Sequence, residues 1–156
     1  GDGFKICMWQ LKNTRLGCAA GALGVGGAAL ELAIDYANER TQFGTPISRH
    51  QMIQAQIAEM AVEHEAARML VYRAAWLKDN GKPNQFETSV AKLQASEAAV
   101  HAANECMKIF GSYGFSTEYP AERLYRDAKS LQIVEGTSNI QKLIIAGIAC
   151  GHTPNR

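Results

Sequence analysis

The sequence carries almost no net charge and no long hydrophobic run. Its 16 Lys and Arg oppose 15 Asp and Glu, which leaves a net charge of +1, and the basic residues form no stripe that could neutralise a phosphate backbone. This balance argues against nucleic acid as a partner. The longest uncharged stretch lies between Arg15 and Glu31 and is rich in Gly and Ala, so we predict no membrane span.

Cysteines are also few, and the four that are present lie far apart. None forms a C-x-x-C pair or has a histidine at metal-ligand spacing, so no metal site is predicted. There is no signal-peptide pattern either. We therefore expect four buried free thiols in a reducing compartment, namely Cys7, Cys18, Cys106 and Cys150.

What is present is the makeup of one soluble globular domain, because 47% of the 156 residues are hydrophobic and 20% are charged. The chain opens on a turn-like Gly1-Asp2-Gly3 instead of a start methionine and runs straight into a helical pattern. We expect a fragment cut at a domain boundary. Its parts would be a boundary segment over 1–12, a helical domain over 13–150 and a C-terminal tail over 151–156.

Small and apolar residues recur every three and four positions from about Thr14 to Ala37, the period of one helix face. They predict a long first helix. Several glycines lower its helix propensity, and close packing against another helix is the favoured compensation. These glycines are Gly17, Gly21, Gly24, Gly26 and Gly27. The run from Gly24 to Ala29 also fits a dinucleotide fingerprint, but no strand precedes it, so that interpretation is disfavoured.

Further apolar stripes predict four more helices. His64 lies within the second stripe, where a hydrogen-bonded histidine is favoured over a ligand, and we assign it no function. No segment alternates like a strand. The sequence therefore predicts an all-α fold, an antiparallel four-helix-type bundle with short extra C-terminal helices. The four helices would run from a Ser48 cap to about Asn80, from Phe86 to Phe110, from Ala121 to about Lys129 after Pro120, and from a Thr137 or Ser138 cap to about Ala149.

The most unusual local feature is Glu135, a lone carboxylate between an apolar run and Gly136. It can be a solvated loop residue whose charge favours the positive end of the next helix. Alternatively, its apolar neighbourhood makes it a stronger base that takes a weakly acidic proton, and the glycine lets a flat ligand approach the backbone. The spacing alone leaves both interpretations open.

Two further segments crowd polar residues beside turn glycines. In Glu39–Gly44, an arginine and an aromatic ring could engage a phosphate and a flat ring, although a basic C-terminal turn closed by glycine is equally common. In Lys108–Ser112, a lysine and free backbone amides at a helix end could also meet phosphate.

In this order, the segments closely resemble the acyl-CoA dehydrogenase family over nearly the whole chain. The ordered series is far more specific than any single member. Its elements are Gly1-Asp2-Gly3-Phe4, Thr14-Arg15, Tyr36-Ala37, Glu39-Arg40-Thr41-Gln42-Phe43-Gly44, His50-Gln51, Gly114-Phe115, Tyr119-Pro120, Glu122-Arg123-Leu124, Arg126-Asp127-Ala128 and Glu135-Gly136-Thr137-Ser138.

The resemblance implies a catalytic role for Glu135, because the family's glutamate before Gly-Thr-Ser removes the α-proton of an acyl-CoA thioester. The β-hydrogen then leaves as hydride to the flavin of FAD. Some members place the base on the first helix instead, where this chain has Thr14, so the resemblance implies Glu135 as the base. Thr14 and Arg15 are then expected on the substrate side or in the framework.

The resemblance also implies residues that contact FAD. Those of the first helix end and the following turn are expected to reach the flavin of a neighbouring subunit. The full set is Arg40, Gln42, Phe43, His50, Gln51, Lys108, Gly111, Ser112, Gly136, Thr137, Ser138 and Asn139. Lys108, Ser112 and Asn139 depart from the residues that are usual in the family.

As partners, the resemblance implies an acyl-CoA substrate, an electron-transfer flavoprotein as electron acceptor, and a homo-oligomer, either a dimer or a tetramer. It implies a cytoplasmic location, or the mitochondrial matrix in a eukaryote. Acyl-chain length stays open, and some relatives run as enoyl-CoA reductases. The isolated fragment, which lacks the family's β-domain and N-terminal helices, is expected to be inactive and could act only as a helical association module.

Overall fold

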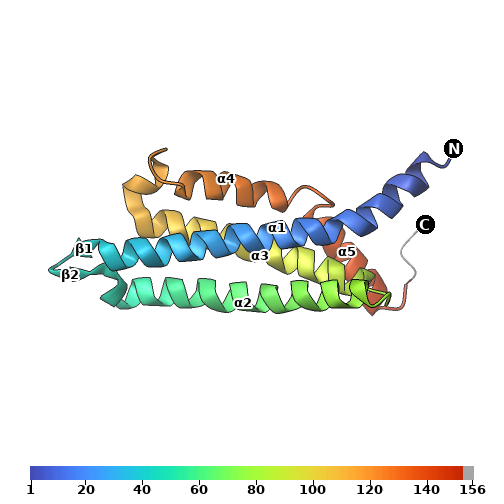
Figure 1. The fold of residues 1–156 in the computed structure, drawn as a ribbon, viewed down its shortest axis with the longest axis horizontal. Coiled ribbons are helices and arrows are strands. Elements are labelled where there is room, and N and C mark those ends of the chain that lie inside the picture. Colours follow the sequence, from blue (N-terminus) through green and yellow to red (C-terminus); the bar gives the residue numbers. More distant parts are fainter. Residues whose placement is uncertain (153–156) are drawn as a thin grey trace.

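The computed structural model describes residues 1–152 and confirms the all-α bundle (Figure 1). Three long helices lie side by side: α1 (Gly3–Glu39), α2 (Gln51–Asp79) and α3 (Gln85–Phe110). Two shorter helices, α4 (Ala121–Leu131) and α5 (Ser138–Ala149), pack against α3. The ends of α2 and α3 lie close to the predicted positions because their apolar stripes are regular.

The first helix begins earlier than predicted. A start near Thr14 is wrong, since α1 begins at Gly3 and continues through the whole of the segment 3–12. Its first turns project beyond the bundle in Figure 1, and Phe4 and Trp9 there are 68% and 67% exposed. The helical pattern is weak in these turns because no neighbouring helix of this chain covers them.

A short hairpin joins α1 to α2, and the sequence analysis missed it. Strands β1 (Thr41–Gln42) and β2 (Thr45–Pro46) pair antiparallel, with Phe43 and Gly44 at positive φ between them. Ser48 does not cap α2, because a 3-10 turn over Ile47–Arg49 precedes the helix and His50 is its N-cap residue. The predicted Ser48 cap is therefore wrong.

Alanines fill most of the interface between α1 and α3, which lets the two backbones approach closely. A Cβ on Gly26 would lie 3.2 Å from the Ala99 Cα, and one on Gly27 would lie 3.0 Å from the His64 ring. Close helix packing is thus confirmed for these two glycines. It is wrong for the other three, which have open space where a Cβ would stand: Gly17, Gly21 and Gly24.

The C-terminal helices are attached to the end of the bundle by an aromatic cluster. The rings of Tyr36 and Phe110 stack with centroids 3.9 Å apart, and Tyr119 packs edge-on against Phe110 at 5.3 Å. Tyr119 directly precedes Pro120, the N-cap residue of α4. The cluster therefore fixes where α4 begins, and α4 delivers the loop that carries Glu135.

The four cysteines are free thiols, but the expectation that all are buried is wrong. Cys106 is buried in the core, Cys18 is half-buried, and Cys7 and Cys150 are exposed. Cys7 lies on the projecting turns of α1 and Cys150 at the end of α5, and no element within residues 1–152 covers either thiol.

Helix α1 contains an 18-residue window with a mean hydropathy of 1.5, which is long and apolar enough to cross a membrane by length and composition alone. Core helices pass the same test, and in this fold α1 packs along both α2 and α3. The absence of a membrane span therefore stays a prediction.

Candidate active site

Glu135 lies in the loop between α4 and α5, on a turn that only an unusual backbone can form. Its φ is +58°, and that of Gly136 is +91°, so two successive residues are left-handed. A Cβ on Gly136 would stand 2.8 Å from the Gln141 Nε2. Glycine is thus required at 136, whereas Glu135 adopts a conformation that costs a non-glycine residue on the order of 1–3 kcal/mol.

The side chain of this strained residue faces α1. The Thr14 hydroxyl donates a hydrogen bond of 2.6 Å to the Glu135 Oε2, across 121 positions of sequence. Glu135 itself is half-buried. Positions 14 and 135, the two candidate positions for a catalytic base, therefore lie next to each other.

Three buried side chains donate hydrogen bonds to the backbone carbonyls of the same turn. The Arg15 Nε donates to the Glu135 carbonyl at 3.2 Å, and the Gln141 Nε2 donates to both the Glu135 and the Gly136 carbonyls, at 3.3 and 2.9 Å. The Lys92 Nζ also donates to the Gly136 carbonyl, at 2.9 Å. Each of the three is at most 4% exposed, and burial lowers the pKa of both Arg15 and Lys92.

The outer side of the loop is tied to α3 as well. One oxygen of Glu97 accepts from the Ser138 hydroxyl at 2.6 Å, and the other accepts from the Gln132 Nε2 at 2.8 Å. Thr137 caps α5 by accepting from the Ile140 N–H at 3.3 Å, which confirms one of the two predicted caps. The loop is therefore fixed at both ends and at its strained centre.

Most of the other predicted FAD-contacting residues gather at the opposite end of the bundle. Phe43, at the hairpin tip, is 95% exposed, and the ring of His50 packs edge-on against it at 6.0 Å. The Arg40 guanidinium lies over the ring of Tyr113 at 5.8 Å, which places the α1 end beside the turn that follows α3. Lys108, near the same end of α3, is paired with Glu105 at 2.6 Å.

The two groups of residues are far apart. Thr14 and Arg40 are separated by about 39 Å along α1 at 1.5 Å per residue, and Figure 1 places the hairpin and α5 at opposite ends of the bundle. Only Gly136, Thr137, Ser138 and Asn139 of the predicted cofactor residues lie beside Glu135. A ligand bound at Glu135 therefore cannot also lie against Arg40 of the same chain.

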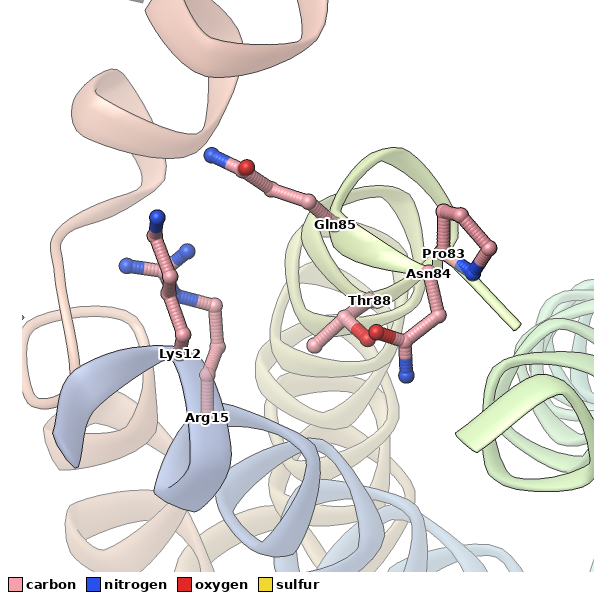
Figure 2. A pocket seen from close by; sticks show the side chains of 6 residues that line it. All are labelled: Lys12, Arg15, Pro83, Asn84, Gln85 and Thr88. Atoms are coloured by element: carbon pink, nitrogen blue, oxygen red, sulfur yellow. The ribbon is translucent and has the colours of Figure 1, made fainter. Parts of the chain in front are cut away.

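A cavity of about 250 Å³ opens next to Arg15, between α1 and the N-terminus of α3 (Figure 2). Lys12 and Arg15 line its α1 side, and Pro83, Asn84, Gln85 and Thr88 line the other. Thr88 is 3% exposed, and within residues 1–152 its hydroxyl has no hydrogen-bond partner. Two cations, a free hydroxyl and a helix N-terminus suit an anion.

Comparison with known proteins decides the family. The model for the C-terminal domain of acyl-CoA dehydrogenase matches residues 1–149. The chain belongs to the acyl-CoA dehydrogenase family. The glutaryl-CoA dehydrogenase of Desulfococcus multivorans is 52% identical over 147 residues, which make up 94% of this chain and 38% of that relative.

Solved acyl-CoA dehydrogenase structures share the fold. Butyryl-CoA dehydrogenase from Megasphaera elsdenii matches 96% of this chain with a TM-score of 0.93 and 45% identity, and the match covers 39% of that chain. A glutaryl-CoA dehydrogenase from Mycobacterium smegmatis in complex with FADH2 matches 94% of this chain, with a TM-score of 0.88 and 31% identity, over 38% of its own length. This chain thus spans less than half the length of each relative.

In this acyl-CoA dehydrogenase domain, the sequence pointed to Glu135, Thr14 and Arg15, which meet at the loop. It did not point to Lys92 and Gln141, which also support the loop. Lys92 and Gln141 lie on helix faces that the apolar stripes assign to the core, and a lysine between Ala91 and Leu93 was the available signal. Lys12 and Thr88, which line the cavity, belong to none of the sequence motifs described above.

Proposed function

We propose that this chain is the C-terminal domain of a FAD-dependent acyl-CoA dehydrogenase that converts an acyl-CoA thioester to the trans-2-enoyl-CoA. Glu135 removes the α-proton, and the β-hydrogen leaves as hydride. Bound FAD would supply the acceptor for that hydride, so the substrate would be oxidised by two electrons while the α-proton is held on Glu135. An electron-transfer flavoprotein is the proposed acceptor for those electrons.

The observation that carries the proposal is the carboxylate of Glu135 on its left-handed turn. Within residues 1–152, the side chains that donate hydrogen bonds to the carbonyls of Glu135 and Gly136 are those of Arg15, Lys92 and Gln141. The carboxylate itself accepts a hydrogen bond from the Thr14 hydroxyl. A loop residue with a solvated charge would need neither the strained backbone nor the buried donors.

The same turn supplies a hydrogen-bond donor for the developing enolate. Within residues 1–152, the Glu135 N–H donates to no backbone or side-chain acceptor. A thioester α-proton is only weakly acidic, so its removal needs donors aimed at the thioester carbonyl, where negative charge develops. We assign that role to the Glu135 N–H, next to the base itself.

The cavity beside Arg15 is the proposed site for an anionic part of the CoA. It adjoins the loop, because Arg15 both lines the cavity and donates to the Glu135 carbonyl. Its positive side chains and the α3 N-terminus match the negative charges of CoA, and the Thr88 hydroxyl gains a partner there. Contacts in this cavity would add to the affinity for the CoA ester in the bound state and the transition state alike.

The hairpin end of the bundle fits FAD, but as a site shared between subunits. Phe43 offers an exposed aromatic ring, Arg40 a cation, and His50 and Gln42 polar atoms, a set suited to a ring and a pyrophosphate. Since this end lies about 39 Å along α1 from Thr14, it would hold the FAD of a neighbouring subunit. A homo-oligomer, either a dimer or a tetramer, follows from that arrangement, and its location would be the cytoplasm or the mitochondrial matrix.

The second candidate function is that the isolated chain acts only as a helical association module. Exposed apolar side chains along α2 favour it, including Val62, Met69, Tyr72 and Trp76, which are 55–70% exposed. Flavin absorbance of the purified 156-residue chain separates the two: a colourless chain supports the module, and a chain loaded stoichiometrically with FAD contradicts it.

The test of the main proposal uses the full-length protein that contains this chain. Purified holoenzyme is mixed without oxygen with a panel of straight-chain, branched and dicarboxylic CoA esters, and flavin absorbance is followed. Bleaching by at least one saturated ester, with formation of the enoyl-CoA, is expected. A flavin that no ester reduces, but that enoyl-CoA reoxidises, would support the reductase direction instead.

A further inference from the structure

Lys92 is a lysine without access to water. It lies on α3 among Ala91, Ala95 and Ala99, and none of its side chain is exposed. Burying an ammonium group costs several kcal/mol unless its charge is compensated. An apolar residue would fill the same position at a lower cost, so the amino group has a specific use there.

Within residues 1–152, Lys92 makes one side-chain hydrogen bond, to the loop that carries Glu135. Its Nζ donates to the Gly136 carbonyl at 2.9 Å, one peptide bond beyond Glu135. A bond from a charged donor to a neutral carbonyl is roughly twice as strong as one between neutral groups. The buried amino group is therefore directed at the carbonyl of the residue that follows the strained Glu135.

Gln141 also donates to the carbonyls of this turn, and the turn determines how its amide group is oriented. Its Nε2 reaches both carbonyls of the turn, while its Oε1 is buried without a partner in the described part of the chain. Turning the amide over would satisfy neither carbonyl, so the loop determines the orientation of Gln141. Lys92 and Gln141 thus donate to the carbonyls of the turn, although the Gln141 Oε1 is left without a partner in the described residues.

We propose that Lys92 is a positioning residue for Glu135: its buried ammonium holds the Gly136 carbonyl and thereby keeps the left-handed turn that aims the carboxylate at the α1 side of the site. The proposal rests on the proposed function of Glu135 and adds a residue that acts through the backbone. Without Lys92, Gln141 still satisfies the Gly136 carbonyl, so the loop stays folded but samples other turn conformations.

The experiment compares two variants in the full-length holoenzyme. Lys92→Met keeps the length of the side chain and removes the donor, while Lys92→Gln keeps a neutral donor. The control is Lys129→Met, the same chemical change at an exposed lysine whose Nζ donates a hydrogen bond to the Gln132 side chain. FAD content, the melting temperature, the rate constant of flavin reduction and the apparent Kd of the reducing CoA ester are measured for each.

Lys92→Met is expected to lower the rate constant of flavin reduction by roughly 10- to 100-fold, the loss that a misplaced reacting group causes. FAD content and the apparent Kd should stay within about two-fold of the wild type, because one donor to the carbonyl remains. Lys92→Gln should recover part of the rate, and Lys129→Met should match the wild type.

Three results would overturn the proposal. These are an unchanged rate in Lys92→Met, loss of FAD or of the fold in both Lys92 variants, or an equal loss in Lys129→Met. The proposed function has its own readout, since it fails if the wild type is not reduced or if Glu135→Gln is reduced normally. A wild-type rate in Lys92→Met beside an inactive Glu135→Gln would refute only the role of Lys92.

Discussion

The Thr14 hydroxyl and the Glu135 carboxylate are joined by a hydrogen bond of 2.6 Å, although the two residues stand 121 positions apart. Position 14 on α1 and position 135 in the C-terminal loop therefore face the same space. A carboxylate at either position could reach a substrate held there, which is a physical reason why the family can place its base at either one. In this chain, threonine orients the carboxylate of the other position.

The first prediction concerns this hydrogen bond. Thr14→Val keeps the shape of the side chain and removes the donor, so the Glu135 carboxylate loses one fixed orientation. We expect flavin reduction in the full-length enzyme to slow by roughly 5- to 10-fold, which corresponds to about 1–1.4 kcal/mol for one hydrogen bond. Asn13→Ala is the control, because the Asn13 side chain donates only within α1, to the Trp9 carbonyl. Equal rates in Thr14→Val and the wild type would contradict the role of the hydroxyl.

Gly136 provides the second prediction. Alanine there would be strained at φ +91° and would press its Cβ against the Gln141 Nε2, so we expect Gly136→Ala to lower the free energy of unfolding by about 1–3 kcal/mol. The matched control is Gly24→Ala, in the open part of α1, which should raise stability by about 0.5–1 kcal/mol through helix propensity. Denaturant unfolding of both variants measures the difference, and a destabilised Gly24→Ala would mean that this face of α1 is covered in the assembly.

The cavity beside Arg15 gives a third prediction, on substrate affinity. Lys12→Ala removes one cation from its lining, and Thr88→Val removes the unpartnered hydroxyl. Each is expected to raise the KM for CoA esters by roughly 5- to 10-fold with little change in kcat, since the contacts form equally in the bound and transition states.

Lys5→Ala is the control for the cavity. It removes the same charge from an exposed position on the projecting turns of α1, where Lys5 pairs with Asp2. If Lys5→Ala raises KM as much as Lys12→Ala does, the cations act only by general attraction, and the cavity holds no part of the CoA.

Sequence periodicity could predict most of the fold because α2 and α3 each bury one regular stripe. It failed where the local pattern does not determine the backbone. The hairpin after α1 has only two residues in each strand, too few to alternate, and the turns of α1 from Gly3 have no covering partner in this chain. Ser48 carries a good capping side chain, but the 3-10 turn that contains it places His50 at the helix start.

Sequence motifs indicated the residues of the loop and of α1 that meet at the candidate site, but not the supporting residues of α3 and α5. Glu135 stands out because a carboxylate follows an apolar run, whereas Lys92 and Gln141 are distant in sequence and act on backbone carbonyls, which no side-chain motif records. Buried polar residues in an apolar stripe are a usable signal for such support. Lys92 and Gln141 illustrate the point, since both are fully buried and donate to the loop.

The fourth prediction is a pH dependence of stability at the interface of α2 and α3. Burial raises the pKa of Glu105, but hydrogen bonds from Lys108, Gln56 and Asn104 outweigh it, so the pKa lies below the ordinary value of 4.5. A carboxyl group with a lowered pKa in the folded state stabilises the fold above its unfolded pKa, and this stability is lost as pH falls through the folded value.

Denaturant unfolding at pH 7 and at stepwise lower pH measures this dependence. The wild type should lose stability as the pH falls below about 4.5, and Glu105→Gln should lose less over the same range because it has no proton to gain. A steeper loss in Glu105→Gln than in the wild type would contradict the ionised, hydrogen-bonded state of Glu105.

The central claim is that Glu135 is the base, and Glu135→Gln in the full-length holoenzyme tests it most directly. Glutamine keeps the size of the side chain and can still bond to Thr14, so FAD content and the melting temperature should match the wild type. The CoA ester that bleaches the wild-type flavin should reduce the variant at least roughly 100-fold more slowly, since a general base contributes that much or more. A variant that retains FAD and is reduced at the wild-type rate would contradict the assignment.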